Sequence, residues 1–224
     1  YFCQVTMIHG DEGQYLRVTQ SLIRDGDIDL ANNLDSSTTG EFHVTEFGLA
    51  KAPGSPPGKV HSVHPIGLSV LLVPAYWLRL QLWANPRLSC ALFMCLLSAA
   101  TAAATFVWLS RLGISLAAAL LAVSVLTLTA PFFLYSNQLY PEIPALLIAL
   151  ITLSCMAHWL GSKGTYRSMG RWETAQLGLL AFLEWILPFL HPRYLPLAAL
   201  LLALLLPQCW FSAAPRRNLF SVLA

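Results

Sequence analysis

Residues 88–110 read LSCALFMCLLSAATAAATFVWLS, an apolar run without a charged side chain. A run of about 20 such residues has the length that crosses a bilayer as an α-helix. Similar runs follow at 114–135, 143–160, 175–190 and 194–211. Together they predict an all-α fold in which residues 88–224 form a polytopic bundle of transmembrane helices.

The composition indicates a membrane protein. Hydrophobic residues make up 56% of the chain and charged residues 11%, with a mean hydropathy of +0.61. A soluble domain carries about a quarter charged residues. We therefore expect a multi-pass protein whose surroundings are the lipid bilayer. The net charge of +2 offers no electrostatic footprint for nucleic acid.

The cysteines and the chain ends carry little chemistry. Five cysteines show no CxxC pair, and four of them lie in apolar runs, so we interpret them as packing residues. The chain starts at Tyr1 instead of Met and stops inside an apolar run at Ala224. We expect a fragment of a longer protein.

Residues 1–87 form a chemically separate region, because eight of the eleven acidic residues lie before position 47. Asp11 has the position of a helix N-cap, and Gln14 completes a capping-box spacing. The predicted helix, about 12–25, is amphipathic, and Gly26 ends it. Its predicted apolar face holds Tyr15, Val18, Leu22 and Ile23, opposite Arg17, Gln20 and Arg24. We expect this helix to lie flat on the membrane interface.

The segment 66–83 decides on which side of the membrane the acidic region lies. Basic residues near span ends favour the cytoplasm. This rule places Arg111 and the basic residues of 163–171 and 216–217 inside, and Glu142 and Arg193 outside. If 66–83 crosses the membrane, Asp11 lies opposite Glu142. Pro74, Arg79 and three aromatic residues suit an interfacial or re-entrant helix instead, which would bring all these polar residues to the exterior.

The order of short motifs resembles that of a known family. Asp11-Glu12-x-x-Tyr15 precedes Arg24-Asp25-Gly26-Asp27, and a loop then ends in His64-Pro65-Ile66-Gly67. Further motifs are 135–142, YSNQLYPE, and 191–194, HPRY. This order resembles the GT-C class of integral-membrane glycosyltransferases, closest to the branch of protein O-mannosyltransferases and aminoarabinose transferases.

The resemblance implies an inverting transfer of a sugar from a polyprenyl-phosphate donor to an acceptor hydroxyl. It implies a cell (inner) membrane enzyme whose catalytic loop is exterior or periplasmic. Asp11 matches the family's catalytic carboxylate, and Glu142 a second acidic position that is usually Asp. His64 stands where many members have a lysine that contacts the lipid phosphate. Arg193 matches a cationic phosphate contact of a later loop.

The residue chemistry suits these roles. A carboxylate near a hydroxyl acts as a general base, and a guanidinium binds a leaving phosphate. We expect Asp11 as the base and Glu12 as a residue that orients the acceptor or holds a cation. Lys59 is a possible helper of Arg193. The set of predicted substrate contacts is His64, Lys59, Arg193 and Tyr15.

A glycan, lipid or protein remains open as the acceptor. We predict no metal site from histidine or cysteine spacing. A divalent cation bound by Asp11, Glu12 and Glu142 is conceivable, since all three offer hard oxygen ligands.

Structural explanations exist for the same residues. Asp11 can simply cap a helix, and Glu142 can face a helix dipole. Arg193 can anchor the interface, and His64 can be a loop residue. Glu184 lies within an apolar run, where an ionisable group favours a functional or hydrogen-bonded role.

Two other functions fit the sequence. One is a transporter or flippase of lipid-linked saccharides that uses Glu184 and a central cavity. The other is a non-catalytic scaffold for envelope polysaccharide assembly.

Overall fold

The computed structural model describes residues 8, 10–34, 51–82, 85–161 and 171–213. These residues are helical apart from loops, and the one β-pairing among them is an isolated bridge between Lys51 and Ser62. The all-α prediction is confirmed. The helices are α1 (Glu12–Arg24), η2 (Asn32–Leu34), α3 (Gly67–Leu82), α4 (Pro86–Arg111), α5 (Leu116–Leu128), α6 (Ala130–Tyr135), α7 (Glu142–Gly161), α8 (Arg171–Leu190), η4 (Pro192–Tyr194) and α9 (Leu195–Ala213).

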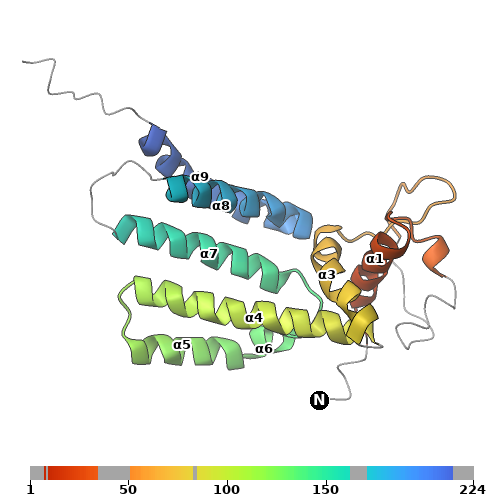
Figure 1. Cartoon of the computed structure of the whole chain (residues 1–224), viewed down its shortest axis with the longest axis horizontal. Coiled ribbons are helices and arrows are strands. Elements are labelled where there is room, and N and C mark those ends of the chain that lie inside the picture. Colours follow the sequence, from red (N-terminus) through yellow and green to blue (C-terminus); the bar gives the residue numbers. More distant parts are fainter. Residues whose placement is uncertain (1–7, 9, 35–50, 83–84, 162–170, 214–224) are drawn as a thin grey trace, which may run out of the picture.

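The helices form a bundle with two helices across one end (Figure 1). α5, α4, α7 and α8 follow one another side by side along the long axis, and α9 packs on α8. α1 and α3 lie at one end, which we call the α1 end. The helices α4, α7 and α9 begin at this end, and α6 and α8 finish there. Loop residues from four parts of the chain therefore meet at the α1 end.

Most predicted bundle helices are present. The run at 88–110 belongs to α4, whose N-cap Asn85 accepts hydrogen bonds from the backbone amides of Arg87 and Leu88. The run at 143–160 becomes α7, the run at 175–190 becomes α8 from Arg171 onward, and the run at 194–211 becomes α9.

The prediction of one continuous helix over 114–135 is wrong. Thr129 is extended, with φ −72° and ψ 147°, and it separates α5 from α6. Pro131 explains the break, because its ring would clash with a carbonyl of the preceding turn and it has no amide hydrogen to donate. At the start of a new helix this proline is tolerated.

The predicted N-cap position of Asp11 in α1 is confirmed, but the expected capping hydrogen bond and the exposed polar face are not. Asp11 is the N-cap residue, but its backbone is helical and its side chain makes no capping hydrogen bond. The carboxylate is thus free to point elsewhere. Arg17 and Gln20, expected on an exposed polar face, are buried. Arg17 donates to the backbone oxygen of Asn33, and burial lowers the pKa of its guanidinium.

α3 is the helix expected at 66–83, and it lies across the end of the bundle, packed on α1, α4 and α8. Ser69 donates a hydrogen bond to the backbone oxygen of Tyr15 at 3.1 Å, and Thr19 donates to that of Ser69 at 3.1 Å. Gly67 lies against α8, where a Cβ atom would come within 2.7 Å of the backbone nitrogen of Leu190. The close approach at Gly67 brings the end of α8 next to the His64 loop.

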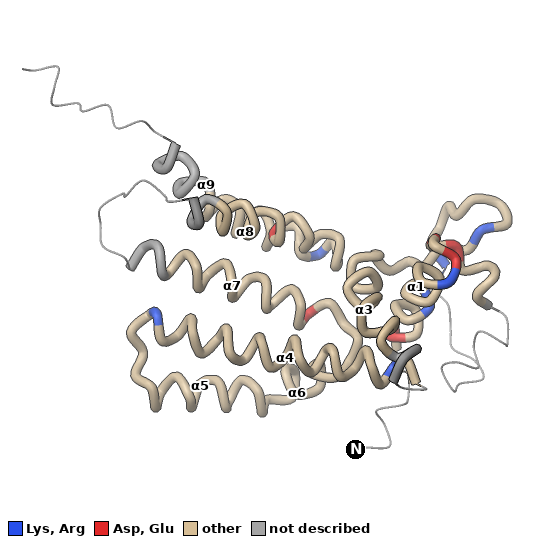
Figure 2. The backbone as a smooth tube through the Cα atoms, in the orientation of Figure 1, with Lys and Arg blue, Asp and Glu red and all other residues tan. Residues whose placement is uncertain are grey.

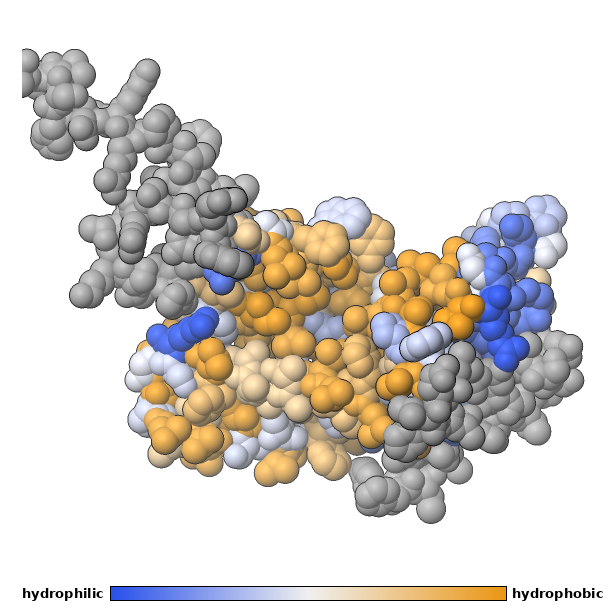
Figure 3. All heavy atoms as spheres, viewed as in Figure 1, coloured by the Kyte–Doolittle hydropathy of each residue, from blue (hydrophilic) through white to orange (hydrophobic). Residues whose placement is uncertain are grey.

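Polar and apolar surfaces are segregated. Charged residues gather at the α1 end, and few lie along the bundle helices (Figure 2). Apolar side chains cover the bundle in the face shown in Figure 3. Among the residues described in full, α4 is the one helix long and apolar enough to cross a membrane, and five further apolar stretches are shorter.

Candidate functional site

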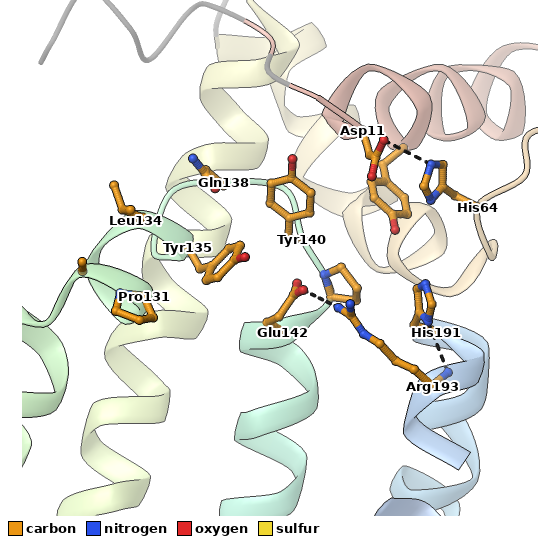
Figure 4. A pocket seen from close by; sticks show the side chains of 13 residues that line it. Asp11, His64, Pro131, Leu134, Tyr135, Gln138, Tyr140, Glu142, His191 and Arg193 are labelled. Carbon is orange, nitrogen blue, oxygen red and sulfur yellow. Dashed lines mark hydrogen bonds and ion pairs between the residues drawn. The ribbon is translucent and has the colours of Figure 1, made fainter. Parts of the chain in front are cut away.

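A cavity of about 560 Å³ opens at the α1 end (Figure 4). Its walls come from α1, the His64 loop, α6, the loop before α7, and the turn between α8 and α9. The lining residues are Asp11, Tyr15, His64, Ala130, Pro131, Leu134, Tyr135, Gln138, Tyr140, Pro141, Glu142, His191 and Arg193. The sequence-predicted residues Asp11, Tyr15, His64, Glu142 and Arg193 all lie in this cavity.

Asp11 and His64 form a pair at the cavity wall. The Asp11 Oδ1 atom lies 3.4 Å from His64 Nε2, and Asp11 is 53% exposed while His64 is 16% exposed. Ser62 positions His64: its hydroxyl accepts a hydrogen bond from the His64 backbone amide and donates one to the Gln14 side chain. Gln14, expected to complete a capping box, thus anchors the His64 loop on α1.

Tyr15 packs against His64 in the cavity lining. Its ring centroid is 5.2 Å from that of His64, and its side chain is buried. Burial raises the pKa of the Tyr15 hydroxyl, and the carboxylates of Asp11 and Glu142 raise it further. Tyr15 therefore presents a protonated hydroxyl at the base of the cavity.

Glu142 and Arg193 form an ion pair on the other side of the cavity. The Arg193 guanidinium contacts the Glu142 carboxylate and donates a hydrogen bond to the Tyr194 hydroxyl at 3.0 Å. Arg193 is 49% exposed and Glu142 31% exposed, so a ligand can reach this pair. Glu142 lies at the first residue of α7, where a carboxylate also meets the positive end of the helix dipole.

His191 is a cavity residue that we did not predict. Its Nδ1 atom accepts a hydrogen bond from the backbone amide of Arg193 at 3.2 Å. Burial lowers the pKa of the His191 imidazole, the neighbouring Arg193 and His64 lower it further, and the Glu142 carboxylate opposes the shift. In the neutral ring with Nδ1 as acceptor, Nε2 carries the hydrogen and acts as a donor. The sequence signal for His191 is its place in the motif at 191–194, two residues before Arg193.

Tyr135, Gln138 and Tyr140 were also missed. All three lie in the motif at 135–142, which also contains the predicted site residue Glu142. The rings of Tyr135 and Tyr140 meet edge to face, with centroids 5.6 Å apart. Burial raises the pKa of the Tyr140 hydroxyl, and a hydrogen bond with the Asp11 backbone opposes this shift.

Glu12 does not line the cavity. Its carboxylate is fully buried against the Arg87 guanidinium, with Nη2 at 3.0 Å from Oε1, and also accepts the backbone amide of Leu139. The expectation that Glu12 meets the acceptor or a cation is therefore corrected. Because Glu12 turns away, Asp11, Glu12 and Glu142 do not share a cation site. The described residues contain no group of three His, Cys, Asp or Glu side chains able to hold a metal ion.

Two further predicted residues lie elsewhere. Lys59 is exposed on a loop whose neighbour Val60 donates to the Asp29 carboxylate, and it does not reach the cavity. Glu184 is fully buried within α8 and accepts a hydrogen bond from Thr152 of α7. It too lies outside the cavity.

The cavity combines complementary groups. A half-exposed carboxylate lies beside one imidazole, and a second, neutral imidazole and an ion-paired guanidinium line the same cavity. Such an arrangement can accept a proton from a hydroxyl and bind an anion nearby. Comparison with family models, with curated proteins and with solved structures gave no match to this chain.

Proposed function

We propose that this chain is a membrane glycosyltransferase that moves a sugar from a polyprenyl-phosphate donor to an acceptor hydroxyl. One observation carries the proposal. Asp11, His64, Glu142 and Arg193, which come from distant parts of the chain, line a single cavity at the α1 end. These are the positions that the resemblance to GT-C glycosyltransferases selects.

A membrane-spanning bundle is part of the proposal. α4 has 26 residues, a length of about 39 Å, which exceeds the ~30 Å of bilayer hydrocarbon. Arg111 ends α4 far from the cavity, whereas Arg87 begins it at the α1 end. With Arg111 on the cytoplasmic side, the cavity faces the exterior or periplasm, and α3 lies in the interface without crossing it.

Asp11 is the general base of the proposed reaction. The acceptor hydroxyl passes its proton to the Asp11 carboxylate, and its oxygen forms a bond to the anomeric carbon of the donor sugar. His64, 3.4 Å from Asp11, orients the carboxylate. A base of this kind contributes typically ~10²–10⁴-fold to the rate.

Arg193 and His191 receive the leaving group. The bond from the anomeric carbon to the phosphate oxygen breaks, and the electron pair leaves with the polyprenyl phosphate. Arg193 supplies a fixed positive charge and His191 a neutral donor, which stabilise the phosphate without a proton transfer. Glu142 holds Arg193 in place before the donor binds.

The prenyl chain has a path along α8. Phe182, Trp185 and Phe189 are exposed and form a row along this helix, in which the first two rings are stacked and the last two are tilted. The row ends next to His191, so a phosphate bound at Arg193 leaves its chain on an apolar surface. Burial of that chain favours binding by about 0.8 kcal/mol for each methylene group removed from water.

The test is transfer of radiolabelled sugar by the purified protein in lipid nanodiscs. The donors are undecaprenyl phosphates carrying mannose or aminoarabinose. Asp11→Asn is expected to lower kcat by roughly 10²-fold or more, because the amide cannot accept the proton. Asp25→Asn, a change at an exposed carboxylate beyond the other end of α1, is the matched control and should retain activity. Normal turnover by Asp11→Asn would refute the assignment of the base.

Sidedness has a separate test. Single cysteines at Lys59 and Ser136 should react in intact cells with an impermeant maleimide, whereas a cysteine at Leu112 should not. Leu112 follows α4 at the opposite end of the bundle and is exposed. The same labelling at all three positions, or opposite labelling of Lys59 and Ser136, would contradict the proposed orientation.

A transporter of lipid-linked saccharides is the second candidate function, and Glu184 is the observation that favours it. Its Oε2 atom is buried and has no hydrogen-bond partner within the described chain. Transporters place their substrate sites near the bilayer midplane, where such a carboxylate has a role. Loss of flipping in reconstituted vesicles by Glu184→Gln, with no effect of Asp11→Asn, would favour this function over sugar transfer.

A further inference from the structure

Two tyrosine rings and an amide form one wall of the cavity. Tyr135 is the last residue of α6, and Gln138 and Tyr140 follow in the loop before α7. All three are partly exposed and line the cavity. In Figure 4, Tyr135 and Gln138 lie to the left of Glu142 and Tyr140 lies above it, whereas Arg193 and His191 lie to its right. The cavity thus has an aromatic side and a cationic side.

The aromatic side is suited to a sugar ring. The edge-to-face arrangement of Tyr135 and Tyr140, with centroids 5.6 Å apart, offers both a ring face and a ring edge to a ligand. The C–H face of a pyranose packs on an aromatic ring, and its hydroxyls pair with amide and phenol groups. These three residues supply no charge, so they do not bind a phosphate as Arg193 does.

The position of Tyr140 is fixed relative to Asp11. The Tyr140 hydroxyl is so close to Gly10 that a Cβ atom there would lie 2.7 Å away. The backbone amide of the preceding residue, Leu139, donates a hydrogen bond to Oε1 of the buried Glu12 at 3.0 Å. Since Gly10 and Glu12 flank Asp11, a ligand on the Tyr140 ring lies beside the proposed base.

We propose that Tyr135, Gln138 and Tyr140 form a saccharide subsite for the acceptor, so that the hydroxyl which receives the sugar belongs to a glycan. This inference rests on the proposed glycosyl transfer. In an inverting displacement the acceptor oxygen enters opposite the leaving phosphate. If the phosphate binds on the cationic side, the acceptor therefore binds on the aromatic side, next to Asp11.

The acceptor reaction balances without another reactant. The glycan hydroxyl loses its proton to the Asp11 carboxylate and forms the new glycosidic bond. The sugar–phosphate bond breaks, and polyprenyl phosphate leaves with the electron pair. The tyrosines hold the acceptor ring and take no part in proton transfer.

Steady-state kinetics with two acceptor classes tests the subsite. The acceptors are an oligosaccharide with free hydroxyls and a serine- and threonine-containing peptide. Tyr135→Leu, which removes the ring, should raise KM for the oligosaccharide about 3- to 10-fold and leave the donor KM unchanged. Tyr135→Phe, which keeps the ring, should stay close to the unmodified protein. Phe133→Leu changes an exposed aromatic residue of the same helix outside the cavity and is the matched control.

A binding experiment separates this inference from the proposed function. Saturation-transfer NMR follows the same oligosaccharide on the protein in nanodiscs without donor. Binding that Tyr135→Leu weakens supports the subsite even if no sugar is ever transferred. No binding by the unmodified protein, or transfer to the peptide but not to the oligosaccharide, overturns the inference. A Tyr135→Leu effect on the donor KM alone would assign the ring to the donor and overturn it as well.

Discussion

Glu12 of α1 and Arg87 of α4, which are 75 residues apart in the sequence, form a buried ion pair. Both Nε and Nη2 of Arg87 donate to the Glu12 carboxylate, at 3.0–3.3 Å, and neither side chain is more than 2% exposed. The Glu12 carboxylate also accepts a hydrogen bond from the backbone amide of Leu139, which lies in the same loop as Tyr140. Glu12 thus ties α1, the start of α4 and the loop before α7 together, and it positions Asp11 and Tyr140 without touching the cavity.

Breaking this pair should destabilise the protein strongly. Glu12→Gln leaves the Arg87 charge buried without its counter-ion, which costs about 3–5 kcal/mol. Arg87→Met likewise leaves the Glu12 carboxylate buried without its counter-ion. The double variant removes both charges and should cost much less than the sum of the two single changes. Thermal unfolding in detergent measures all three, and additive losses of stability would contradict a direct ion pair.

Gly67 should be intolerant of any side chain. A Cβ atom there overlaps the backbone carbonyl of Phe189 at the end of α8. Gly67→Ala therefore forces α3 and α8 apart, an overpacking that costs about 1–3 kcal/mol. Gly67→Ala should also lower the rate of sugar transfer, because separation of α3 from α8 displaces the nearby His64 loop. Unfolding midpoint and kcat are the measurements.

Gly178→Ala is the control for Gly67→Ala. Gly178 lies within α8, and a Cβ atom there meets nothing within 4 Å. Alanine favours a helix over glycine by about 1 kcal/mol, so this change should be neutral or stabilising. Equal losses of stability from the two variants would show that close packing is not the reason for Gly67.

Gly10 has two constraints, which a pair of variants can separate. Its φ of +52° is strained for other residues, and its Cβ position is 2.7 Å from the Tyr140 hydroxyl. Gly26 shares the first constraint, with φ +72°, but has open space around it. Each alanine variant should lose about 1 kcal/mol from the backbone strain. Gly10→Ala alone should also lower kcat, because it displaces Tyr140 from Asp11; equal activity of the two variants would speak against that contact.

The sequence predicted the bundle helices and the residues of the proposed site. It did not predict the buried contacts that hold these residues in place. Apolar runs indicated α4, α7, α8 and α9, because a helix needs only its own residues to satisfy its backbone. Motif order selected Asp11, His64, Glu142 and Arg193, and the structure gathers them at one cavity. That this cavity transfers sugar stays a prediction.

The errors came from contacts between distant residues. No periodicity indicates that Glu12 pairs with Arg87, so its acidic side chain was assigned to the site. Likewise, Arg17 was expected to be exposed because amphipathic patterning takes no account of the Asn33 backbone that covers it. The break at Thr129 had a local signal in Pro131, which the length of the apolar run obscured.

His191 should make folding sensitive to mild acid. Burial and the neighbouring Arg193 and His64 lower the pKa of His191 below the ordinary value of about 6.5, so the folded protein binds a proton less readily than the unfolded chain. The contribution of neutral His191 to the free energy of unfolding is therefore fully present above pH 6.5, and it is lost as the pH falls through the pKa of the folded state. His191→Asn removes the titration and keeps an oxygen for the Arg193 backbone amide. Unfolding midpoints between pH 8 and pH 5 should fall less for this variant than for the unmodified protein. Parallel pH profiles would mean that the His191 imidazole has the same proton affinity in both states.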